Sequence, residues 1–435
     1  MTGLLTPYFS RLESSSALRW TGRVTQVTGQ LVESQGPYCS VGELCQIVNA
    51  DGRTFPGEVV GFRESTVLSM PLERPEGIRY GDRVITWGSR AVLRVGKALL
   101  GRVVDGQGGP LDSLPAYAGC DFQMIDAAAP LPLAREMIHE PIGCGIRAVD
   151  GFLTCGRGQR VGIFGGSGVG KSTLIGMMAR NTGADMTVLA LIGERGREVR
   201  HFLEDALGDE GRKRSVVVVS TSDQSPVLRI RAALAATAIA EYFCGRGSNV
   251  LLVVDSLTRL AMAQREIGLA AGEPPTSKGY TPSVFTLLAR LIERAGKFNR
   301  GSITAFYTVL MEGDDQHDPL VDGARALLDG HIMLDRRLAA QNHYPPIAIL
   351  DSISRLMPHV CTAGHLSKAQ SLRRLLASYT ASEDLVRIGA YHKGADPILD
   401  QAMRVMPELA GFLCQGPGES VGLQDTVNRL QAIAG

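Results

Sequence analysis

The chain has 435 residues, of which 44% are hydrophobic and 20% are charged. This length and composition predict a globular protein of two or three domains. The 45 basic and 44 acidic residues leave a formal net charge of +1, which argues against nucleic acid as the main partner. No apolar run reaches about 18 residues, and no basic leader precedes a long apolar segment, so we expect a cytoplasmic protein.

Residues 1–20 have apolar side chains at helical spacing. These are Leu4, Leu5, Tyr8, Phe9 and Leu12. The pattern predicts a short amphipathic segment that contacts a membrane, a partner or a neighbouring subunit. Packing against its own domain is an equally good interpretation.

Residues 21–90 contain short strands separated by glycine and proline. The predicted strands, the first of which begins at Trp20, read WTGRVTQV, GELCQIV, FPGEVVGF, STVLSM and GDRVITW. Several short strands with frequent turn residues are typical of a small β-barrel. We therefore predict an N-terminal β-barrel domain.

Residues 91–358 change to apolar strands that alternate with helical stretches. The strands read RVGIFGG, TVLALIG, SVVVVST, NVLLVVD, SITAFYTVL and HIMLD. Strands that are apolar throughout are buried on both faces, which predicts a mostly parallel sheet between helices, an α/β fold. Residues 359–435 then read as helices, so the predicted order is barrel, α/β core and helical domain.

A phosphate-binding loop follows the first of these core strands. The run GGSGVGKS, residues 165–172, fits the pattern GxxxxGK[ST] between a strand and a helix. Glycines let successive N–H groups point at phosphate oxygens, Lys171 neutralises the β/γ charge, and the Ser172 hydroxyl suits Mg²⁺. The nucleotide-binding residues that we predict here are Gly165, Gly166, Ser167, Gly168, Val169, Gly170, Lys171, Ser172 and Thr173.

Two acidic residues end other apolar strands. Asp255 ends NVLLVVD, where a carboxylate holds the metal through its waters, although an aspartate there can also be a helix cap. Glu194 lies just past TVLALIG and is the candidate to polarise the attacking water. An exposed glutamate at a helix start is the alternative interpretation.

The eight cysteines form no CxxC pair, so we expect reduced thiols and no disulfide. One group, His359, Cys361 and His365, has three potential metal ligands at uneven spacing and no fourth nearby. This spacing does not favour a metal site.

Longer runs resemble the flagellar and type III secretion export ATPases, homologues of the catalytic subunits of rotary ATP synthases. The resemblance rests on GGSGVGKST, LIGERGREVRHFLED, AIAEYF, DSLTRLAMAQREIGLAAGEPP, GYTPSVF, GSITAFYTVLMEGDDQHDP and HYPPIAILDSISR. It covers essentially the whole chain and implies a RecA-like core. The runs EGDDQHDP and SISRLMP favour the flagellar branch, with the injectisome branch as a close second.

The resemblance implies roles for individual residues. It supports the phosphate-loop, Glu194 and Asp255 assignments and adds Arg195 near the phosphates. Tyr344 matches an aromatic residue that packs on adenine, although a tyrosine at a strand end can also belong to the core. Arg355 matches an arginine that reaches the neighbouring subunit's nucleotide, with an ion pair inside its own subunit as the alternative.

The sequence departs from the family pattern at two places. Ala348 stands where the family usually has an acidic residue, which raises the question of how the turn before DSISR is held. No aromatic residue follows Phe412, whereas rotary ATPases close the adenine pocket with an aromatic from the C-terminal domain. The run CQGPGES would then close this pocket, with weak discrimination among nucleoside triphosphates.

The resemblance implies a homohexameric, Mg²⁺-dependent ATPase at the cytoplasmic face of the inner membrane. Its implied partners are the stalk and regulator proteins of the export apparatus, the export gate and chaperone–substrate complexes. Alternatives are a rotary ATP synthase subunit, from which GERGREVRHFLED departs, and a Rho-type RNA translocase, for which the barrel lacks a basic aromatic platform. A subunit that only binds nucleotide would have an amide in place of Glu194.

Overall fold

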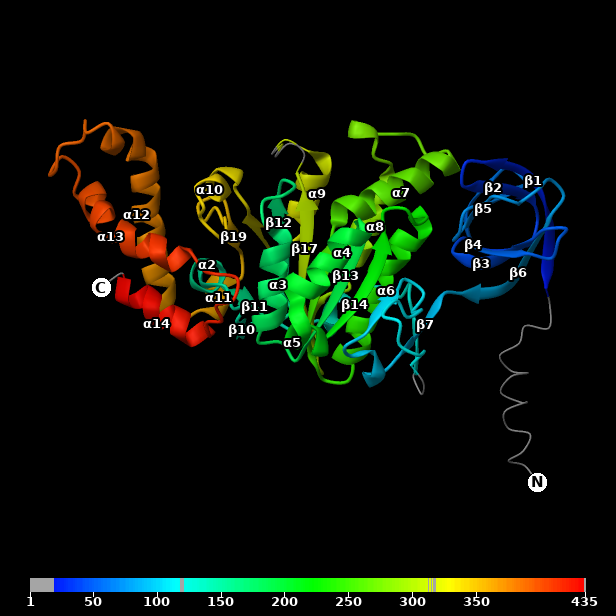
Figure 1. Cartoon of the computed structure of the whole chain (residues 1–435), viewed down its shortest axis with the longest axis horizontal. Coiled ribbons are helices and arrows are strands. Elements are labelled where there is room, and N and C mark those ends of the chain that lie inside the picture. The colour runs from blue at the N-terminus through cyan, green and yellow to red at the C-terminus, as the bar shows by residue number, and fades with distance from the viewer. Residues whose placement is uncertain (1–18, 118–120, 312, 314, 316–317, 434–435) are drawn as a thin grey trace, which may run out of the picture.

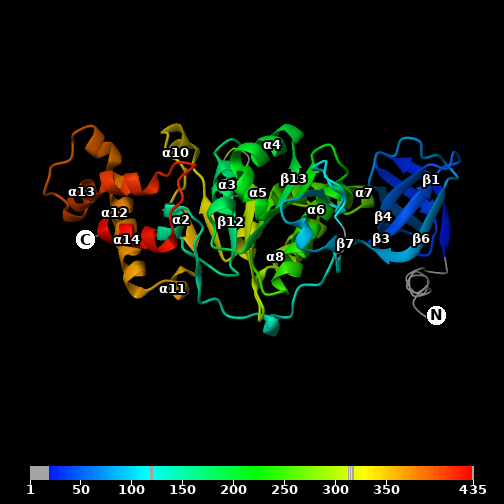
Figure 2. The same cartoon turned by 60° about the horizontal axis from the view of Figure 1, so that its bottom comes forward.

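The structure is a computed structural model that describes residues 19–117, 121–311, 313, 315 and 318–433. The amphipathic segment predicted at residues 1–20 therefore lies outside the described residues, except for its last two. The described chain is elongated, with a barrel at one end, a sheet covered by helices in the middle and a helical domain at the other end (Figures 1 and 2).

The predicted β-barrel is confirmed. Its strands are β1 (Trp20–Thr28), β2 (Leu31–Gln35), β3 (Glu43–Val48), β4 (Thr54–Arg63), β5 (Thr66–Pro71) and β6 (Arg83–Arg90), and they close in the order β1-β2-β5-β4-β3-β6. Alternate residues face inward, so Ile47, Phe55 and Val84 are fully buried in the barrel interior. Strand β2 was not among the predicted strands.

The predicted parallel sheet is also confirmed. The parallel strands are β8 (Val103–Asp105), β12 (Arg160–Gly165), β13 (Met186–Glu194), β14 (Ser215–Thr221), β15 (Asn249–Asp255), β17 (Ser302–Leu310) and β18 (Gly330–Met333). Antiparallel to these run β16 (Gly296–Lys297), which pairs with β17, and β19 (Ile353–Ser354), which pairs with β18. The order across the sheet is β19-β18-β12-β17-β15-β13-β14-β8.

Helices cover both faces of this sheet. The helices of the core domain as a whole are α2 (Arg147–Phe152), α3 (Lys171–Asn181), α4 (Gly196–His201), a π-helical turn at Phe202–Leu207, α5 (Gly208–Lys213), α6 (Pro226–Cys244), α7 (Leu257–Ala271), α8 (Pro282–Ile292), α9 (Pro319–Leu327), α10 (Arg336–Ala340) and α11 (Met357–Val360). Along β13, Val188 and Ala190 pack into the apolar cluster with α6 and α7, whereas Leu189 and Leu191 pack into the one with α3. This alternation explains why the strand is apolar at every position.

Short elements connect the larger parts. The strands β7 (Val92–Val95) and β9 (Asp121–Met124) pair with each other, as do β10 (Pro141–Ile142) and β11 (Cys155–Gly156). Three short 3-10 turns lie at Lys97–Leu99, Pro132–Ala134 and Ser277–Gly279.

The predicted C-terminal helices are α12 (Ala363–Arg387), α13 (Pro397–Leu413) and α14 (Leu423–Ile433). Side chains of Thr362 and Asp396 cap α12 and α13 at their first turns. The helices pack on α2, where the rings of Phe152 and Phe412 meet edge to face at 6.1 Å. Among the described residues, no helix is long and apolar enough to span a bilayer.

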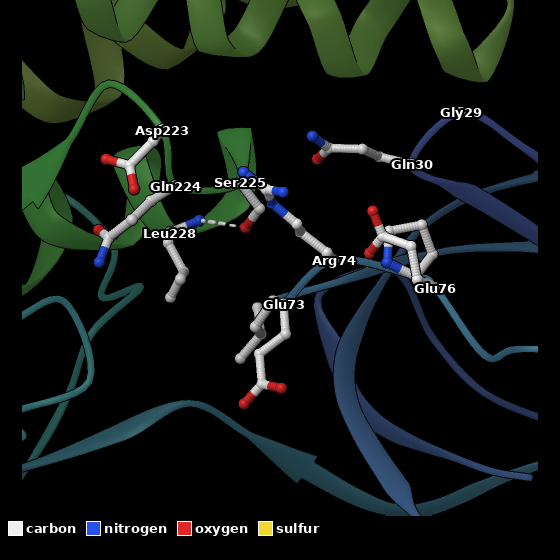
Figure 3. Close-up of a pocket in the computed structure, with 11 residues that line it drawn as sticks. Gly29, Gln30, Glu73, Arg74, Glu76, Asp223, Gln224, Ser225 and Leu228 are labelled. Atoms are coloured by element: carbon white, nitrogen blue, oxygen red, sulfur yellow. Dashed lines mark hydrogen bonds between the residues drawn. The ribbon is translucent and has the colours of Figure 1, made fainter.

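The barrel is held to the core by a buried ion pair in which Arg231 of α6 donates to the Glu58 carboxylate of β4. Beside this junction lies a cavity of about 550 Å³. Figure 3 shows that barrel loops carrying Gln30 and Glu73–Glu76 face the core loop carrying Asp223–Ser225. The residues that line this cavity do not include the phosphate loop, so it is separate from the site described next.

Candidate functional site

The phosphate loop connects the end of β12 to the start of α3. Gly168 and Gly170 have positive φ angles of 77° and 103°, conformations that residues with a Cβ rarely adopt. Lys171 is only 8% exposed, and its Nζ donates to the carbonyl oxygens of Gly165, at 3.0 Å, and of Gly166. The ammonium is therefore held over the loop, while the exposed Ser172 lies in the first turn of α3, whose free N–H groups favour an anion.

Asp255 lies two strands from the phosphate loop and is 6% exposed. Its Oδ1 accepts a hydrogen bond of 2.5 Å from the Thr308 hydroxyl on β17, the strand between β12 and β15. Burial raises the pKa of Asp255, against the effects of this hydrogen bond and of the positive charge of Lys171. Asp255 is not the cap of α7, because Ser256 caps that helix through its own hydroxyl.

Glu194 ends β13, and its carboxyl group is partly buried between the core and α4. Burial, a hydrogen bond with the Glu198 side chain and the charge of Asp255 together raise the pKa of Glu194 to about 8. A carboxyl group with a pKa near working pH is well matched to proton transfer from water. The surroundings of Glu194 therefore differ from those of an ordinary surface glutamate.

Two further residues of this cluster, Glu198 and Arg259, were not among the predicted site residues. Arg259 lies in the first turn of α7, and its charge acts on both Glu194 and Asp255. Its side chain packs against Gly193, and its Nε is buried without a hydrogen-bond partner among the described residues. The spacing signals were present, since Glu198 follows Glu194 by four residues and Arg259 follows Asp255 by four.

The composition of this cluster fits a metal–nucleotide complex. Three carboxylates, those of Glu194, Glu198 and Asp255, act on one another here, with Lys171 and Arg259 as the opposing charges. Added positive charge would relieve the cost of ionising the buried carboxylates. A carboxylate and a hydroxyl, from Asp255 and Ser172, are ligands that Mg²⁺ accepts directly or through water.

Tyr344 lies beside the phosphate loop and is 44% exposed, so it is not a core residue. A Cβ placed on Gly170 would lie 3.8 Å from the Tyr344 ring. The ring therefore has both the position and the exposure to pack on a base. Arg195, in contrast, is exposed at the start of α4, and its carbonyl oxygen accepts the Glu198 N–H.

The segment between α13 and α14, residues 414–422, is hereafter the C-terminal loop. The Gln415 N–H donates to the Tyr344 carbonyl oxygen at 2.7 Å, and the Cys414 thiol lies 3.4 Å from His343 Nδ1. Arg180 at the end of α3 donates to the Pro417 carbonyl oxygen at 2.7 Å. The run CQGPGES thus lies against Tyr344, where the sequence analysis expected a replacement for the missing aromatic residue.

Arg355 lies far from the phosphate loop of its own chain. Its N–H donates to the Asp329 carbonyl oxygen, and the Asp329 N–H donates to Arg160, which starts β12. The loop begins at Gly165, about 16 Å further along that strand at roughly 3.3 Å per residue. Arg355 is exposed and forms no salt bridge within the described ranges, so the alternative of an internal ion pair has no support there.

Hydrogen bonds to main-chain groups hold the turn before Arg355, although Ala348 stands where the family usually has an acidic residue. The Ala348 N–H donates to Met333 at 2.8 Å, and its carbonyl oxygen accepts the Ser352 hydroxyl at 2.6 Å. Arg373 of α12 donates to the carbonyl oxygens of Leu350 and Ser352. An acidic side chain at position 348 is therefore not needed to form this turn.

The group His359, Cys361 and His365 is dispersed. The His365 ring is buried and bonds the Gly151 carbonyl oxygen at 2.9 Å through Nε2, whereas His359 is exposed. No cluster of three potential metal ligands occurs in the part of the chain that the structure describes. The seven described cysteines are free thiols.

Taken together, the fold and the site define a phosphate-loop nucleoside triphosphatase with a RecA-like parallel sheet, a β-barrel before it and a helical domain after it. Family models match each of the three parts. The ATP synthase alpha/beta family matches with its beta-barrel domain at residues 24–88 and its nucleotide-binding domain at 145–354. The T3SS EscN ATPase C-terminal domain matches residues 361–432.

Individual relatives match almost the whole chain. The flagellum-specific ATP synthase of Bacillus subtilis is 49% identical over 98% of this chain and 97% of its own. The type 3 secretion system ATPase of Xanthomonas euvesicatoria is 48% identical over 95% and 93%. A solved structure of the assembled ATPase EscN with its central stalk EscO, from enteropathogenic E. coli, is 42% identical with a TM-score of 0.87, covering 95% of this chain and all of that one.

The chain therefore belongs to the ATP synthase alpha/beta family, in the branch of flagellar and type III secretion ATPases, and it is an ATPase. The predicted flagellar export function fits these relatives, and the injectisome alternative is not favoured over it. The use of ATP follows from the nucleotide-binding domain.

Proposed function

We propose that this protein hydrolyses Mg-ATP for a flagellar protein export apparatus, with catalytic sites completed between subunits of a homohexamer. The proposal rests on one observation: Lys171, Asp255 and Glu194 meet at the carboxyl end of the sheet, whereas Arg355 lies near its amino end and faces outward. One subunit can therefore bind nucleotide but lacks Arg355 at its own site.

The residues of one subunit divide the work of binding and hydrolysis. The phosphate-loop N–H groups and Lys171 bind the β- and γ-phosphates, and Arg195 lies near them. Ser172 and Asp255 would hold Mg²⁺, which neutralises charge on the phosphate oxygens when bound. Glu194 accepts a proton from the attacking water, while Arg259 favours the ionised forms of Glu194 and Asp255.

Arg355 serves the nucleotide of the next subunit in this proposal. A guanidinium presents planar, paired donors that match the oxygens of a transferring phosphoryl group. Arg355 directly follows the edge strand β19, is exposed, and donates its main-chain N–H to Asp329, which suits a residue that enters a neighbour's site. Burial lowers the pKa of His331, and the charges of Arg325 and Arg355 lower it further, against a hydrogen bond to the Asp351 main chain that raises it.

The proposed partners follow from the relatives. The solved EscN assembly contains a central stalk, and by analogy we assign to this chain a ring with a stalk protein. Regulator proteins, the export gate and chaperone–substrate complexes complete the proposed partner set. We place the protein in the cytoplasm, associated peripherally with the inner membrane. No nucleic-acid partner is proposed.

A mixing experiment tests the shared site. Lys171→Ala and Arg355→Ala proteins should each be nearly inactive, and they should regain activity when mixed in equal amounts. Random mixing gives about a quarter of interfaces an intact phosphate loop facing an intact arginine, so recovery of up to about 25% is expected. A mixture that stays inactive although subunit exchange is demonstrated would refute the shared site.

The choice of export system needs a separate test. A chromosomal deletion complemented by the gene should restore filaments and swimming, and Glu194→Gln should not. Normal filaments in the deletion strain, together with loss of effector secretion, would move the protein to the injectisome branch.

A further inference from the structure

A buried arginine ties the C-terminal loop to the nucleotide-binding core. Arg147 of α2 has a side chain that is 7% exposed. Its Nε donates to the Phe412 carbonyl oxygen at 2.9 Å, its Nη2 to the Cys414 carbonyl oxygen, and its Nη1 to the Glu419 carboxylate at 2.6 Å. One guanidinium thus bonds both ends of the turn that carries Gln415.

The same turn is bonded a second time through Gln415, which is 3% exposed. The Arg147 N–H donates to Gln415 Oε1 at 2.8 Å, and Gln415 Nε2 donates to the Gly145 carbonyl oxygen at 2.8 Å. The Gln415 main chain then donates to Tyr344. A continuous series of hydrogen bonds therefore runs from α2 through the loop to the main chain of Tyr344, whose ring lies beside the phosphate loop.

Glu419 closes this arrangement from the far side of the turn. Its Oε1 accepts the Gly416 N–H at 3.1 Å while its Oε2 accepts from Arg147. The Gly416 hydrogen bond and the Arg147 side chain both lower the pKa of Glu419. A planar fork that bonds a carboxylate and two carbonyl oxygens at once is a geometry that lysine cannot reproduce.

We propose that Arg147 is a positioning residue that fixes the C-terminal loop against Tyr344 and thereby sets the affinity for the base of the nucleotide. The inference rests on the proposed nucleotide site and extends it to a residue that touches neither phosphate nor metal. Loss of the Arg147 contacts should free the loop, so base binding weakens while the groups around the γ-phosphate stay in place.

A ligand without a base separates this role from a general structural one. In Arg147→Lys, we expect KM for ATP to rise about tenfold with kcat changed by less than about twofold. The inhibition constant of Mg-tripolyphosphate against ATP hydrolysis should stay within about twofold of wild type, because this ligand makes only the phosphate contacts. Glu419→Gln removes one charge from a half-exposed side chain and should give the same selectivity with a smaller shift.

Arg102 supplies a matched control. It is also largely buried, and it bonds the Asp112 carboxylate and the Pro115 carbonyl oxygen in a loop of the core near β8. Arg102→Lys should change neither KM for ATP nor inhibition by tripolyphosphate. Thermal unfolding of all variants verifies that they are folded.

Two results would overturn the inference. The first is that ATP and tripolyphosphate bind more weakly by the same factor in Arg147→Lys and Glu419→Gln. The second is that ATP binding is not weakened in either variant. Failure of the underlying site gives a different result: in an equilibrium titration, Lys171→Ala would then bind Mg-tripolyphosphate as tightly as wild type does. If Arg147→Lys does not fold, Glu419→Gln alone decides between these outcomes.

Discussion

The two ends of the central sheet differ in how their charged side chains are buried and partnered. At the carboxyl end, the partly buried Glu194 and the buried Asp255 have raised pKa values and lie close to the cations of Lys171 and Arg259. At the amino end, Arg355 is exposed and has no ion pair with a described residue. Buried charges must be partnered where they lie, whereas an exposed guanidinium is free to find its partner on another molecule.

This contrast means that the residues that bind nucleotide and the arginine proposed to assist hydrolysis lie at opposite ends of the sheet in one chain. The carboxyl end contains what is needed to hold a nucleotide, and the amino end contains a cation that its own site cannot use. If the comparison is right, variants at the two ends should fail in different ways.

The largest effect is expected at the exposed end. Arg355→Ala should lower kcat by about 10³-fold or more while ATP binding persists, because a transition-state arginine contributes about 10³ to 10⁵ in rate. Its melting temperature should stay within about one degree of wild type, since no ion pair is lost. Arg355→Lys should recover only part of the rate. A large loss of stability in Arg355→Ala would instead indicate a structural role.

Glu194→Gln should stop turnover at the buried end. The expected loss in kcat is about 10²- to 10⁴-fold, because an amide cannot accept the proton of the attacking water. Equilibrium titration should show that ATP binding is retained, and an equal mixture with Arg355→Ala should regain at most about 25% of wild-type activity, at Arg355→Ala sites that face the intact arginine of a Glu194→Gln subunit. Glu198→Gln is the control, with a much smaller loss. Wild-type hydrolysis by Glu194→Gln would exclude Glu194 as the base.

The pH dependence of the rate sharpens the same assignment. Because the pKa of Glu194 is raised to about 8, kcat/KM should rise by up to tenfold per pH unit below that value and level off above it. The residual activity of Glu194→Gln should lack this dependence. A wild-type profile that is flat between pH 6 and pH 8 would contradict the prediction.

Stability should show the opposite trend with pH. A carboxyl group whose pKa is raised by folding binds its proton more tightly in the native state, so stability is lost as pH rises from about 4.5 to about 8. Glu194→Gln removes this loss and should be more stable than wild type at pH 8 by about 1 kcal/mol, after allowance for partial exposure. Urea unfolding at pH 5 and pH 8 measures the difference, which should be close to zero at the lower pH.

The smallest effect is expected at position 348. Ala348→Asp restores the family's usual acidic character at a turn whose main-chain bonds are already made. Stability should change by less than about 0.5 kcal/mol and kcat by less than about twofold. A large gain in rate would mean that the turn before Arg355 is poorly placed without the acidic side chain.

The sequence alone determined the parts whose signals are local. The phosphate loop needs glycines, a lysine and a hydroxyl in fixed order, and strands buried on both faces must be apolar throughout, so residues 165–172 and the six core strands were predictable. The ends of two such strands also indicated Glu194 and Asp255. The short strands β8, β16 and β19 were not predicted, because two or three residues carry no periodic pattern.

Only the tertiary structure decided which distant side chains share an environment. The raised pKa of Glu194 depends on how deeply β13 is covered and on Glu198 and Asp255, which no single stretch of sequence brings together. Arg147 meets residues 412–419 across more than 260 positions, and Arg355 bonds Asp329, which in turn bonds Arg160 at the start of β12, far from the phosphate loop. These contacts arise from packing and strand order, which short sequence patterns do not encode.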